Sequence, residues 1–323
     1  MKLGVFNPVL AEMPFKEMVE YLASLGVQQL EMGAGGNPGK AHFDPEVLLS
    51  DESKMDEIKQ ILAENNMTIA AISCHGNAVH PNKEIAQKFH NDFENAVLLA
   101  EKLGVTTIVD FSGCPGDSAT STQPNWVTCS WPPDYLKVLE YQWNEVLIPY
   151  WKQAATFCKA HGIQKIAFEM HPGFCVYNTS SLLKLREAVG DIIGANVDPS
   201  HLFWQGMDPV EVIKALGKAN AIYHFHAKDT KIDKANTSVN GVLDVGSYKD
   251  VLGRSWVFRT VGYGHGKEVW NAIISALKAV GYDGVISIEH EDKLMSPKEG
   301  LEKAIQFLQE VIIYEQPRKA WWI

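Results

Sequence analysis

Cysteine is scarce in this sequence, and no two cysteines are spaced as a metal-binding or redox pair. Five occur in 323 residues, an odd and scattered set: Cys74, Cys114, Cys129, Cys158 and Cys175. The absence of a CxxC pair argues against a zinc knuckle and against a framework of disulfide bonds. We therefore expect the protein to work in a reducing compartment, the cytoplasm.

Long apolar runs and an excess of positive charge are also missing. No run of apolar residues reaches the length of a membrane span, and the N-terminus does not have the pattern of a signal peptide. The 39 acidic residues outnumber the 29 lysines and arginines, which gives a formal net charge of −10 and a pI near 5.6. This balance argues against nucleic acid or an anionic membrane as a partner.

What the sequence does contain is a regular alternation of strand-like and helix-like segments. We expect strands at residues 2–7, 28–33, 68–75, 106–111, 165–171, 193–197, 221–226 and 284–288. We expect helices at 14–25, 54–66, 84–103, 134–161, 180–189, 208–216, 267–280 and 296–313. Eight such units predict an α/β fold, a (β/α)8 TIM barrel over residues 1–313. An open doubly wound sheet is the alternative, but no GxGxxG follows the first strand.

Two further segments carry expectations of their own. Pro149 should kink the long helix at 134–161, because proline cannot donate a helical hydrogen bond. The tail at 314–323 carries Trp321 and Trp322 just before its last residue, and we expect it to dock on the barrel or on a partner subunit.

Two connections are unusually long, the loops after the fourth and seventh strands. The first, at 112–133, contains Trp126 and Trp131; it is either an aromatic loop over the barrel mouth or a packed surface loop. The second, at 230–266, ends in a glycine-rich run that we interpret as a hinge rather than a phosphate-binding loop.

The seventh strand ends in a histidine pair, which draws attention to the strand ends as a group. His224 and His226 are two residues apart, so their side chains share one face of the strand. A single such histidine is more often a hydrogen-bonded core residue than a ligand. However, four consecutive strands end in ligand-type side chains: Glu169, Asp198, His226 and Glu289. Their spacings of 29, 28 and 63 residues fit one strand–helix unit each, with the long second loop inside the last.

Because active sites of TIM barrels lie at the carboxyl ends of the strands, these four side chains should meet. Three carboxylates and one imidazole suit a divalent ion in six-fold coordination, with Mn²⁺ the first choice and Mg²⁺, Co²⁺ or Fe²⁺ as alternatives. Without a cation, converging carboxylates would repel one another and one would be protonated. The competing interpretation is that each residue is an ordinary polar group paired with a neighbouring loop.

Five motifs give the chain a resemblance to a known family. IAFEMHPG, NVDPSH, HFHAKD, RTVGYGHG and ISIEHED together resemble the xylose isomerase-like TIM-barrel family, the sugar phosphate isomerase/epimerase group. The resemblance covers essentially the whole chain. It implies that Glu169, Asp198, His226 and Glu289 are the metal ligands and that His201 contacts substrate oxygens. It also implies that Glu169 and Glu289 exchange a proton with the substrate.

The chain departs from the ketose 3-epimerase branch of that family at two positions. A substrate-binding glutamate of those enzymes is replaced by Cys175, and an arginine is replaced by Ile232, so that the HAKD motif is closer to inosose dehydratases. We expect His171 to be a catalytic acid, with His75 and His265 as alternatives. We assign the remaining polar residues near the strand ends to substrate binding: His201, His75, Lys228, Arg259 and His265.

Two reactions fit a site of this kind. A metal next to a carbonyl acidifies the α-proton, and the resulting enediolate is either reprotonated, as in an isomerase or epimerase, or expels a β-substituent, as in a lyase. The lyase alternative is similar to the catalytic subunit of C-glycoside deglycosidases, which act on 3-oxo-glycosides and pair with a smaller subunit. The expected partners are therefore a carbohydrate or oxidised glycoside, and either further copies of the chain or a smaller subunit. A trinuclear-zinc endonuclease and a non-catalytic sugar-binding barrel are less favoured alternatives.

Overall fold

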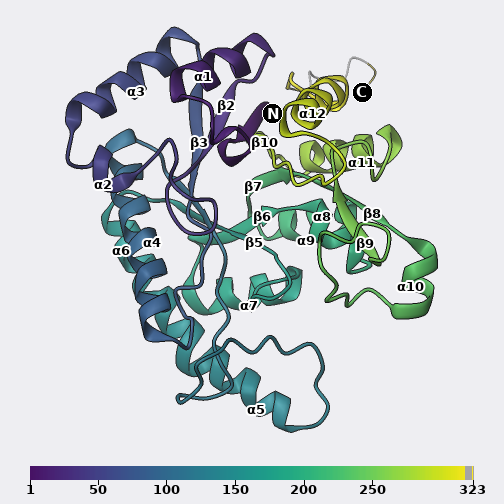
Figure 1. Ribbon diagram of the computed structural model, residues 1–323. Helices are drawn as coiled ribbons and strands as arrows, with labels where there is room; N and C mark the ends of the chain where they lie inside the picture. The colour runs from purple at the N-terminus through teal and green to yellow at the C-terminus, as the bar shows by residue number, and fades with distance from the viewer. Residues whose placement is uncertain (317–321, 323) are drawn as a thin grey trace.

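Eight parallel strands form a closed barrel at the centre of the computed structural model, which describes residues 1–316 and 322 (Figure 1). Around the barrel the order is β1-β10-β7-β6-β5-β4-β3-β2. The strands are β1 (Lys2–Phe6), β2 (Gln29–Gly33), β3 (Thr68–Ser73), β4 (Thr107–Asp110), β5 (Lys165–Glu169), β6 (Ile193–Val197), β7 (Ile222–Ala227) and β10 (Val285–Ile288). The prediction of a TIM barrel is confirmed.

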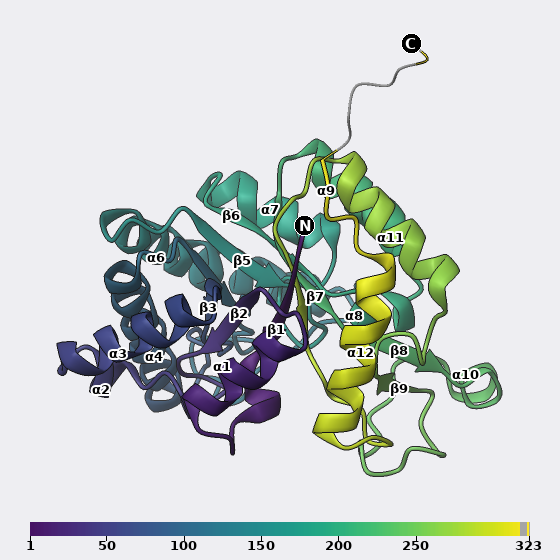
Figure 2. The same cartoon turned by 90° about the horizontal axis from the view of Figure 1, so that it is seen from above.

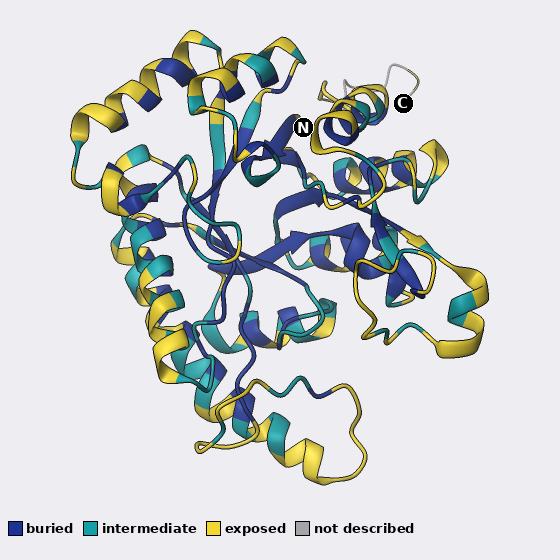
Figure 3. Cartoon of the chain, viewed as in Figure 1, coloured by how far each residue is buried: buried dark blue, intermediate teal, exposed yellow. Residues whose placement is uncertain are grey.

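Helices surround the barrel, and most of them pack an apolar face on the outside of the strands (Figures 1 and 2). They are α1 (Phe15–Ser24), α2 (Pro45–Leu48), α3 (Glu52–Glu64), α4 (Lys83–Leu103), α5 (Asp134–Tyr141), α6 (Ile148–Ala160), α7 (Thr179–Val189), α8 (Pro199–Trp204), α9 (Pro209–Lys218), α10 (Lys234–Asn240), α11 (Lys267–Ala279) and α12 (Pro297–Val311). Figure 3 shows the barrel strands almost wholly buried, with exposed residues on the outer faces of the helices. A short 3-10 turn, Asn7–Leu10, follows β1.

The long helix expected at 134–161 is divided into three parts. A π-helical segment, Gln142–Leu147, joins α5 to α6 directly before Pro149. Proline cannot donate a hydrogen bond to the preceding turn, and a wider turn before it accommodates the missing bond. The expected irregularity is therefore present, as a π segment rather than a simple kink.

The second long connection contains regular secondary structure, whereas its sequence predicts a loop. It holds α10 and an antiparallel hairpin of β8 (Asp229–Ile232) and β9 (Trp256–Arg259). Trp256 stacks on Trp204 of α8, with ring centroids 4.5 Å apart and planes 7° apart. This aromatic contact attaches the hairpin to the barrel beside β7 and α8 (Figure 2).

The glycine-rich run at the end of this connection binds a side chain of the protein itself. The backbone N–H groups of Gly262, Gly264 and His265 all donate to Oδ2 of Asp229, which is buried. An alanine Cβ at Gly264 would overlap the carbonyl oxygen of Thr230. The turn is thus a receptor for the Asp229 carboxylate, not for a phosphate group.

The first long connection packs on the side of the barrel. Trp126 is in edge-to-face contact with Tyr177, at a centroid distance of 5.4 Å, whereas Trp131 is 72% exposed. Neither tryptophan lines the main cavity described below. Of the two alternatives, the packed surface loop is therefore the one observed.

The predicted docking of the C-terminal tail concerns mostly residues outside the described part of the chain. Residues 317–321, which include Trp321, and residue 323 are not described, and Trp322 is 70% exposed. The docking stays a prediction. Among the described residues, no helix is both long enough and apolar enough to cross a membrane.

Candidate metal centre

The structure brings the four predicted ligand residues to one point at the carboxyl ends of four adjacent strands. Glu169 is the last residue of β5, Asp198 follows β6, His226 lies in β7 and Glu289 follows β10. One potential ligand atom from each lies within 4.8 Å of those of the other three. Parallel strands in a barrel all end at the same face, so this convergence follows from the topology.

Two of these side chains direct a buried polar atom that makes no hydrogen bond toward the shared centre. These atoms, among the described residues, are Nδ1 of His226 and Oδ2 of Asp198, and the latter is in ion-pair contact with Lys228 Nζ at 3.2 Å. His226 Nδ1 lies 3.1 Å from Glu289 Oε2 and 3.2 Å from Glu169 Oε2. Buried polar atoms without a partner are costly and uncommon, and a cation held between these groups would satisfy them. The donor set therefore fits a divalent metal ion.

Asp198 is held in place by the start of the next helix. Its Oδ1 accepts the backbone N–H of Ser200 at 2.8 Å, so that it caps α8 while Oδ2 remains directed at the centre. Burial raises the pKa of Asp198 to about 7, the Lys228 ammonium opposes this, and the Glu169 carboxylate adds to it.

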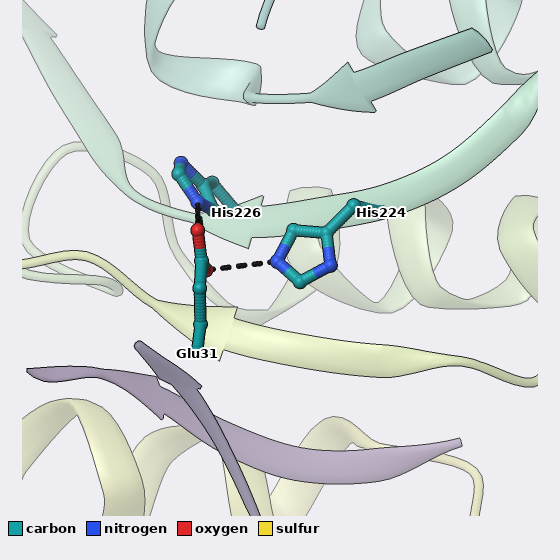
Figure 4. A group of neighbouring side chains, drawn as sticks. All are labelled: Glu31, His224 and His226. Atoms are coloured by element: carbon teal, nitrogen blue, oxygen red, sulfur yellow. Dashed lines mark hydrogen bonds and ion pairs between the residues drawn. The ribbon is translucent and has the colours of Figure 1, made fainter. Parts of the chain in front are cut away.

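Glu31, a residue that the sequence reasoning missed, completes the support of His226. Figure 4 shows the Glu31 carboxylate between the two histidines of β7. Its Oε2 lies 2.9 Å from His226 Nε2 and 2.8 Å from His224 Nε2, and the hydroxyls of Ser73 and Ser287 also donate to the carboxylate. Burial raises the pKa of Glu31, but the two imidazoles lower it well below its usual range, so the group is a carboxylate.

The contact with Glu31 determines which nitrogen of His226 is available as a ligand. A carboxylate accepts hydrogen bonds, so Nε2 of His226 carries a proton and donates it to Glu31. The lone pair of a neutral ring is then on Nδ1, which faces Glu169 and Glu289. This carboxylate–histidine arrangement is common behind metal-binding histidines.

Glu169 is itself surrounded by histidines, among them two predicted to bind substrate. His75 Nε2 lies 3.1 Å from Glu169 Oε2, and His201 Nε2 lies 3.0 Å from Oε1. Burial, with His171 and Lys228 nearby, lowers the pKa of His201 to about 3, so this ring is neutral and donates through Nε2. In the structure these two histidines position Glu169, and His75 also lines the cavity.

Lys228 introduces a buried positive charge beside the ligands. Its Nζ lies 2.7 Å from Glu289 Oε2, 3.2 Å from Asp198 Oδ2 and 3.0 Å from Glu291 Oε2. Burial lowers the pKa of this lysine, but the surrounding carboxylates raise it well above its usual value. The three carboxylate ligands would be balanced in charge by a dication and the Lys228 ammonium together.

His171 is the predicted catalytic acid, and it lies at the edge of the centre. Its Nδ1 donates to the carbonyl oxygen of Pro172 at 2.5 Å, and its ring centroid is 4.1 Å from that of His201. Burial lowers the pKa of His171, so the ring is neutral and its Nε2 is free to accept a proton.

A cavity of about 660 Å³ opens directly over the centre. Of the predicted site residues, those that line it are His75, Glu169, His171, Lys228 and Glu289. Its apolar wall consists of Phe6, Pro8, Val9, Pro38, Phe111, Phe174 and Pro297. A volume of this size is typical of a site for a small molecule.

Three predicted substrate-binding residues do not line this cavity: His201, which lies against Glu169, and Arg259 and His265, which lie elsewhere. Arg259 Nε donates to Asp292 at 3.0 Å, and His265 Nδ1 bonds Asp229 at 2.7 Å while its ring stacks on Phe203. Neither is among the residues that line the cavity. Their side chains fasten the second long connection instead: Arg259 at the end of β9, and His265 in the turn around Asp229.

Comparison with known families identifies the family of the chain. The model of the xylose isomerase-like TIM barrel family matches residues 19–311. The chain belongs to this family. It is also 38% identical over 315 residues to the uncharacterized protein YfiH of Bacillus subtilis strain 168, and the match covers 97% of the chain and 99% of that protein.

Solved structures of low sequence identity share the same fold. The probable 3-DHS dehydratase AsbF of Bacillus anthracis aligns with a TM-score of 0.67 at 18% identity, over 96% of this chain and 99% of that one. The IOLI protein with a bound zinc atom gives the same TM-score and identity over 97% and 98% of the two chains. D-psicose 3-epimerase of Clostridium cellulolyticum H10, solved with D-tagatose, aligns with a TM-score of 0.60 at 16% identity, over 97% and 99%.

Proposed function

We propose that this protein is a divalent-metal-dependent enzyme that removes the proton next to a carbonyl group of a carbohydrate, as an isomerase or epimerase does. The observation that carries the proposal is the convergence of Glu169, Asp198, His226 and Glu289, two of which direct a buried atom that makes no hydrogen bond toward their common centre. The D-psicose 3-epimerase fold match is consistent with this reaction class.

The four residues would hold the ion, with Mn²⁺ the first choice for three carboxylate oxygens and one imidazole nitrogen. When bound, such an ion polarises a carbonyl and the adjacent hydroxyl and stabilises the negative charge that develops on the substrate. Binding through two neighbouring substrate oxygens would fix the sugar against the floor of the cavity.

Proton transfer is then assigned to Glu169 and Glu289. Burial raises the pKa of Glu289, but Lys228 and His226 lower it to about 2, so its carboxylate is ionised and able to accept a proton. Glu169 is held by His75 and His201, whose hydrogen bonds fix the direction of its oxygens. Proton removal by one glutamate and return by the other would invert a stereocentre; return at the neighbouring carbon would isomerise the sugar.

Solvent-deuterium exchange tests this proposal. The Mn²⁺-loaded protein is incubated in D2O with a panel of ketoses that includes D-tagatose and D-fructose, quenched, and analysed by mass spectrometry. We expect deuterium next to the carbonyl of at least one sugar, and a roughly 100-fold or greater loss in Glu289→Gln. The matched control is Glu101→Gln, whose side chain pairs with His161 on the surface at 2.9 Å. Exchange that persists in Glu289→Gln at the wild-type rate would contradict the assignment.

A second reaction is favoured by the position of His171. Its neutral ring lies beside Glu169 and lines the cavity, with Nε2 free. In an elimination, this nitrogen would accept the proton removed from the α-carbon and pass it to the leaving atom as the bond from the β-carbon breaks; that atom is oxygen in a dehydration or an O-glycoside and carbon in a C-glycoside. The dehydratase named among the structural matches and the resemblance to C-glycoside deglycosidases support this alternative.

Product analysis separates the two reactions. The Mn²⁺-loaded protein is incubated with 3-oxo-glycosides, and the released aglycone is measured by liquid chromatography. Release in the wild type, and loss of both aglycone release and deuterium exchange into the sugar in His171→Ala, would support elimination with His171 as the proton carrier. Deuterium exchange without any release would support isomerisation or epimerisation.

A further inference from the structure

A second cavity adjoins the one over the metal centre. It has a volume of about 410 Å³ and is lined by Tyr248, Val257, Phe258 and Lys293, together with His171 and Glu291. His171 and Glu291 line the main cavity as well, so the two spaces meet at these side chains. We call this second space the side cavity.

Two aromatic rings form the wall of the side cavity. The rings of Tyr248 and Phe258 are nearly parallel, with planes 14° apart and centroids 5.9 Å apart. Phe258 is a buried residue of β9, whereas Tyr248 is more than half exposed. An aromatic side chain left exposed next to a catalytic cavity presents a flat apolar surface that water solvates poorly.

Cations hold both rings in position. The guanidinium of Arg254 lies 4.2 Å from the centroid of Tyr248, and Nζ of Lys228 lies 4.7 Å from that of Phe258. Lys228 also touches the metal ligands Asp198 and Glu289. The aromatic wall is therefore joined through one side chain to the reacting centre, and both rings are oriented before any ligand arrives.

From these contacts we infer that the side cavity binds a planar aromatic group carried by the substrate. The inference rests on the proposed function, in which the sugar part of that substrate lies over the metal centre. An aryl substituent on the sugar would pass His171 and Glu291 and lie against Tyr248 and Phe258. Flat rings gain offset or edge contacts with such a wall, whereas a small alkyl group leaves most of it exposed. The hairpin β8–β9 is thus a specificity element.

Binding of two matched glycosides tests the inference without requiring turnover. Affinities of phenyl β-D-glucopyranoside and methyl β-D-glucopyranoside for the Mn²⁺-loaded protein are measured by isothermal titration calorimetry. Burial of a phenyl ring predicts roughly tenfold tighter binding of the phenyl compound. The ratio should fall toward one in Tyr248→Ala, which removes half of the aromatic wall and touches no metal ligand. Tyr135→Ala, which removes another partly exposed tyrosine, on α5, serves as the control and should keep the ratio.

The outcomes separate the side cavity from the reaction. Equal affinities of the two glycosides in the wild type would overturn the inference. So would an equal decrease of the phenyl-to-methyl affinity ratio in Tyr248→Ala and Tyr135→Ala. So would failure of both glycosides to bind at millimolar concentration. An aryl preference that depends on Tyr248, in a protein that shows no deuterium exchange with any sugar, would support the side cavity and contradict the proposed reaction. A substitution at Phe258 is avoided because that ring also packs on His201.

Discussion

The carboxylate of Glu31 lies 2.9 Å from Nε2 of His226, on the side of the imidazole that faces away from Glu169 and Glu289. One short contact thus keeps a proton on Nε2, so that Nδ1 carries the lone pair whenever the ring is neutral. His224, Ser73 and Ser287 donate to the same carboxylate, so its position is fixed from three different strands.

Glu31→Gln is therefore expected to weaken metal binding by roughly 10- to 100-fold. The amide can donate to Nε2 of His226, which would place the ring proton on Nδ1, toward the metal. The measurement is the dissociation constant for Mn²⁺. Glu101→Gln is the matched control because Glu101 pairs with His161 on the surface at 2.9 Å. A wild-type dissociation constant in Glu31→Gln would show that the contact does not set the lone pair.

Gly36 is required by a close approach of two backbone segments behind His75. It has a φ of +64°, and a Cβ at this position would overlap the carbonyl oxygens of Cys74 and His75. We expect Gly36→Ala to lower the free energy of unfolding by about 2 to 4 kcal/mol, from backbone strain and steric overlap together. Urea denaturation, monitored by circular dichroism, measures this change in the free energy of unfolding.

The matched control for this substitution is Gly39→Ala. Gly39 has a similar φ of +74°, but no atom lies within 4 Å of the place that an alanine Cβ would take. The variant should lose only about 1 kcal/mol, from the backbone conformation alone. Equal losses in the two variants would show that the contact with Cys74 and His75 is unimportant.

The raised pKa of Asp110 predicts that the stability of the protein depends on pH. It is buried at the end of β4, and burial raises its pKa to about 7 although Gly76 and Phe111 donate backbone hydrogen bonds to Oδ1. Because this pKa is higher in the folded than in the unfolded chain, the native state holds an extra proton between about pH 4 and pH 7. The stability contributed by that proton is present below this range and is lost as the pH rises through 7.

Asp110→Asn removes the charge while its amide oxygen can accept the same two hydrogen bonds. The free energy of unfolding of the variant, relative to that of the wild type, should increase as the pH rises from 4 to 8, by at most about 4 kcal/mol. Melting temperatures across this range measure the difference, with the exposed Asp134→Asn as the control. A difference between Asp110→Asn and the wild type that does not change with pH would contradict this account.

The convergence of the four ligand residues was predictable because it depends on local features. Each residue stands where an apolar strand ends, and parallel strands of a barrel end at one face. Glu31 was missed because it lies within its strand, between the buried Leu30 and Met32. A charged residue in the interior of an apolar strand was the available signal, but its partner His226 lies 195 residues away in the sequence.

The hairpin β8–β9 was missed for a similar reason. Only Lys228 separates β7 from β8, so the sequence pattern predicts a single strand followed by a loop. The partner strand β9 begins more than twenty residues later, and short polar and aromatic segments have no distinctive period. The positions of Arg259 and His265 follow from this pairing and from the turn around Asp229. Arg259 and His265 stand in a conspicuous sequence motif, but the motif does not show that their side chains lie apart from the cavity.

Metal content is the most direct test of the central claim, that Glu169, Asp198, His226 and Glu289 share one divalent ion. Wild type, Glu169→Gln and Asp198→Asn are each loaded with Mn²⁺, dialysed and analysed by inductively coupled plasma mass spectrometry, with circular dichroism to verify folding. We expect about one equivalent in the wild type and a small fraction of one in each folded variant. A full equivalent of metal in both variants would contradict the assignment of the centre.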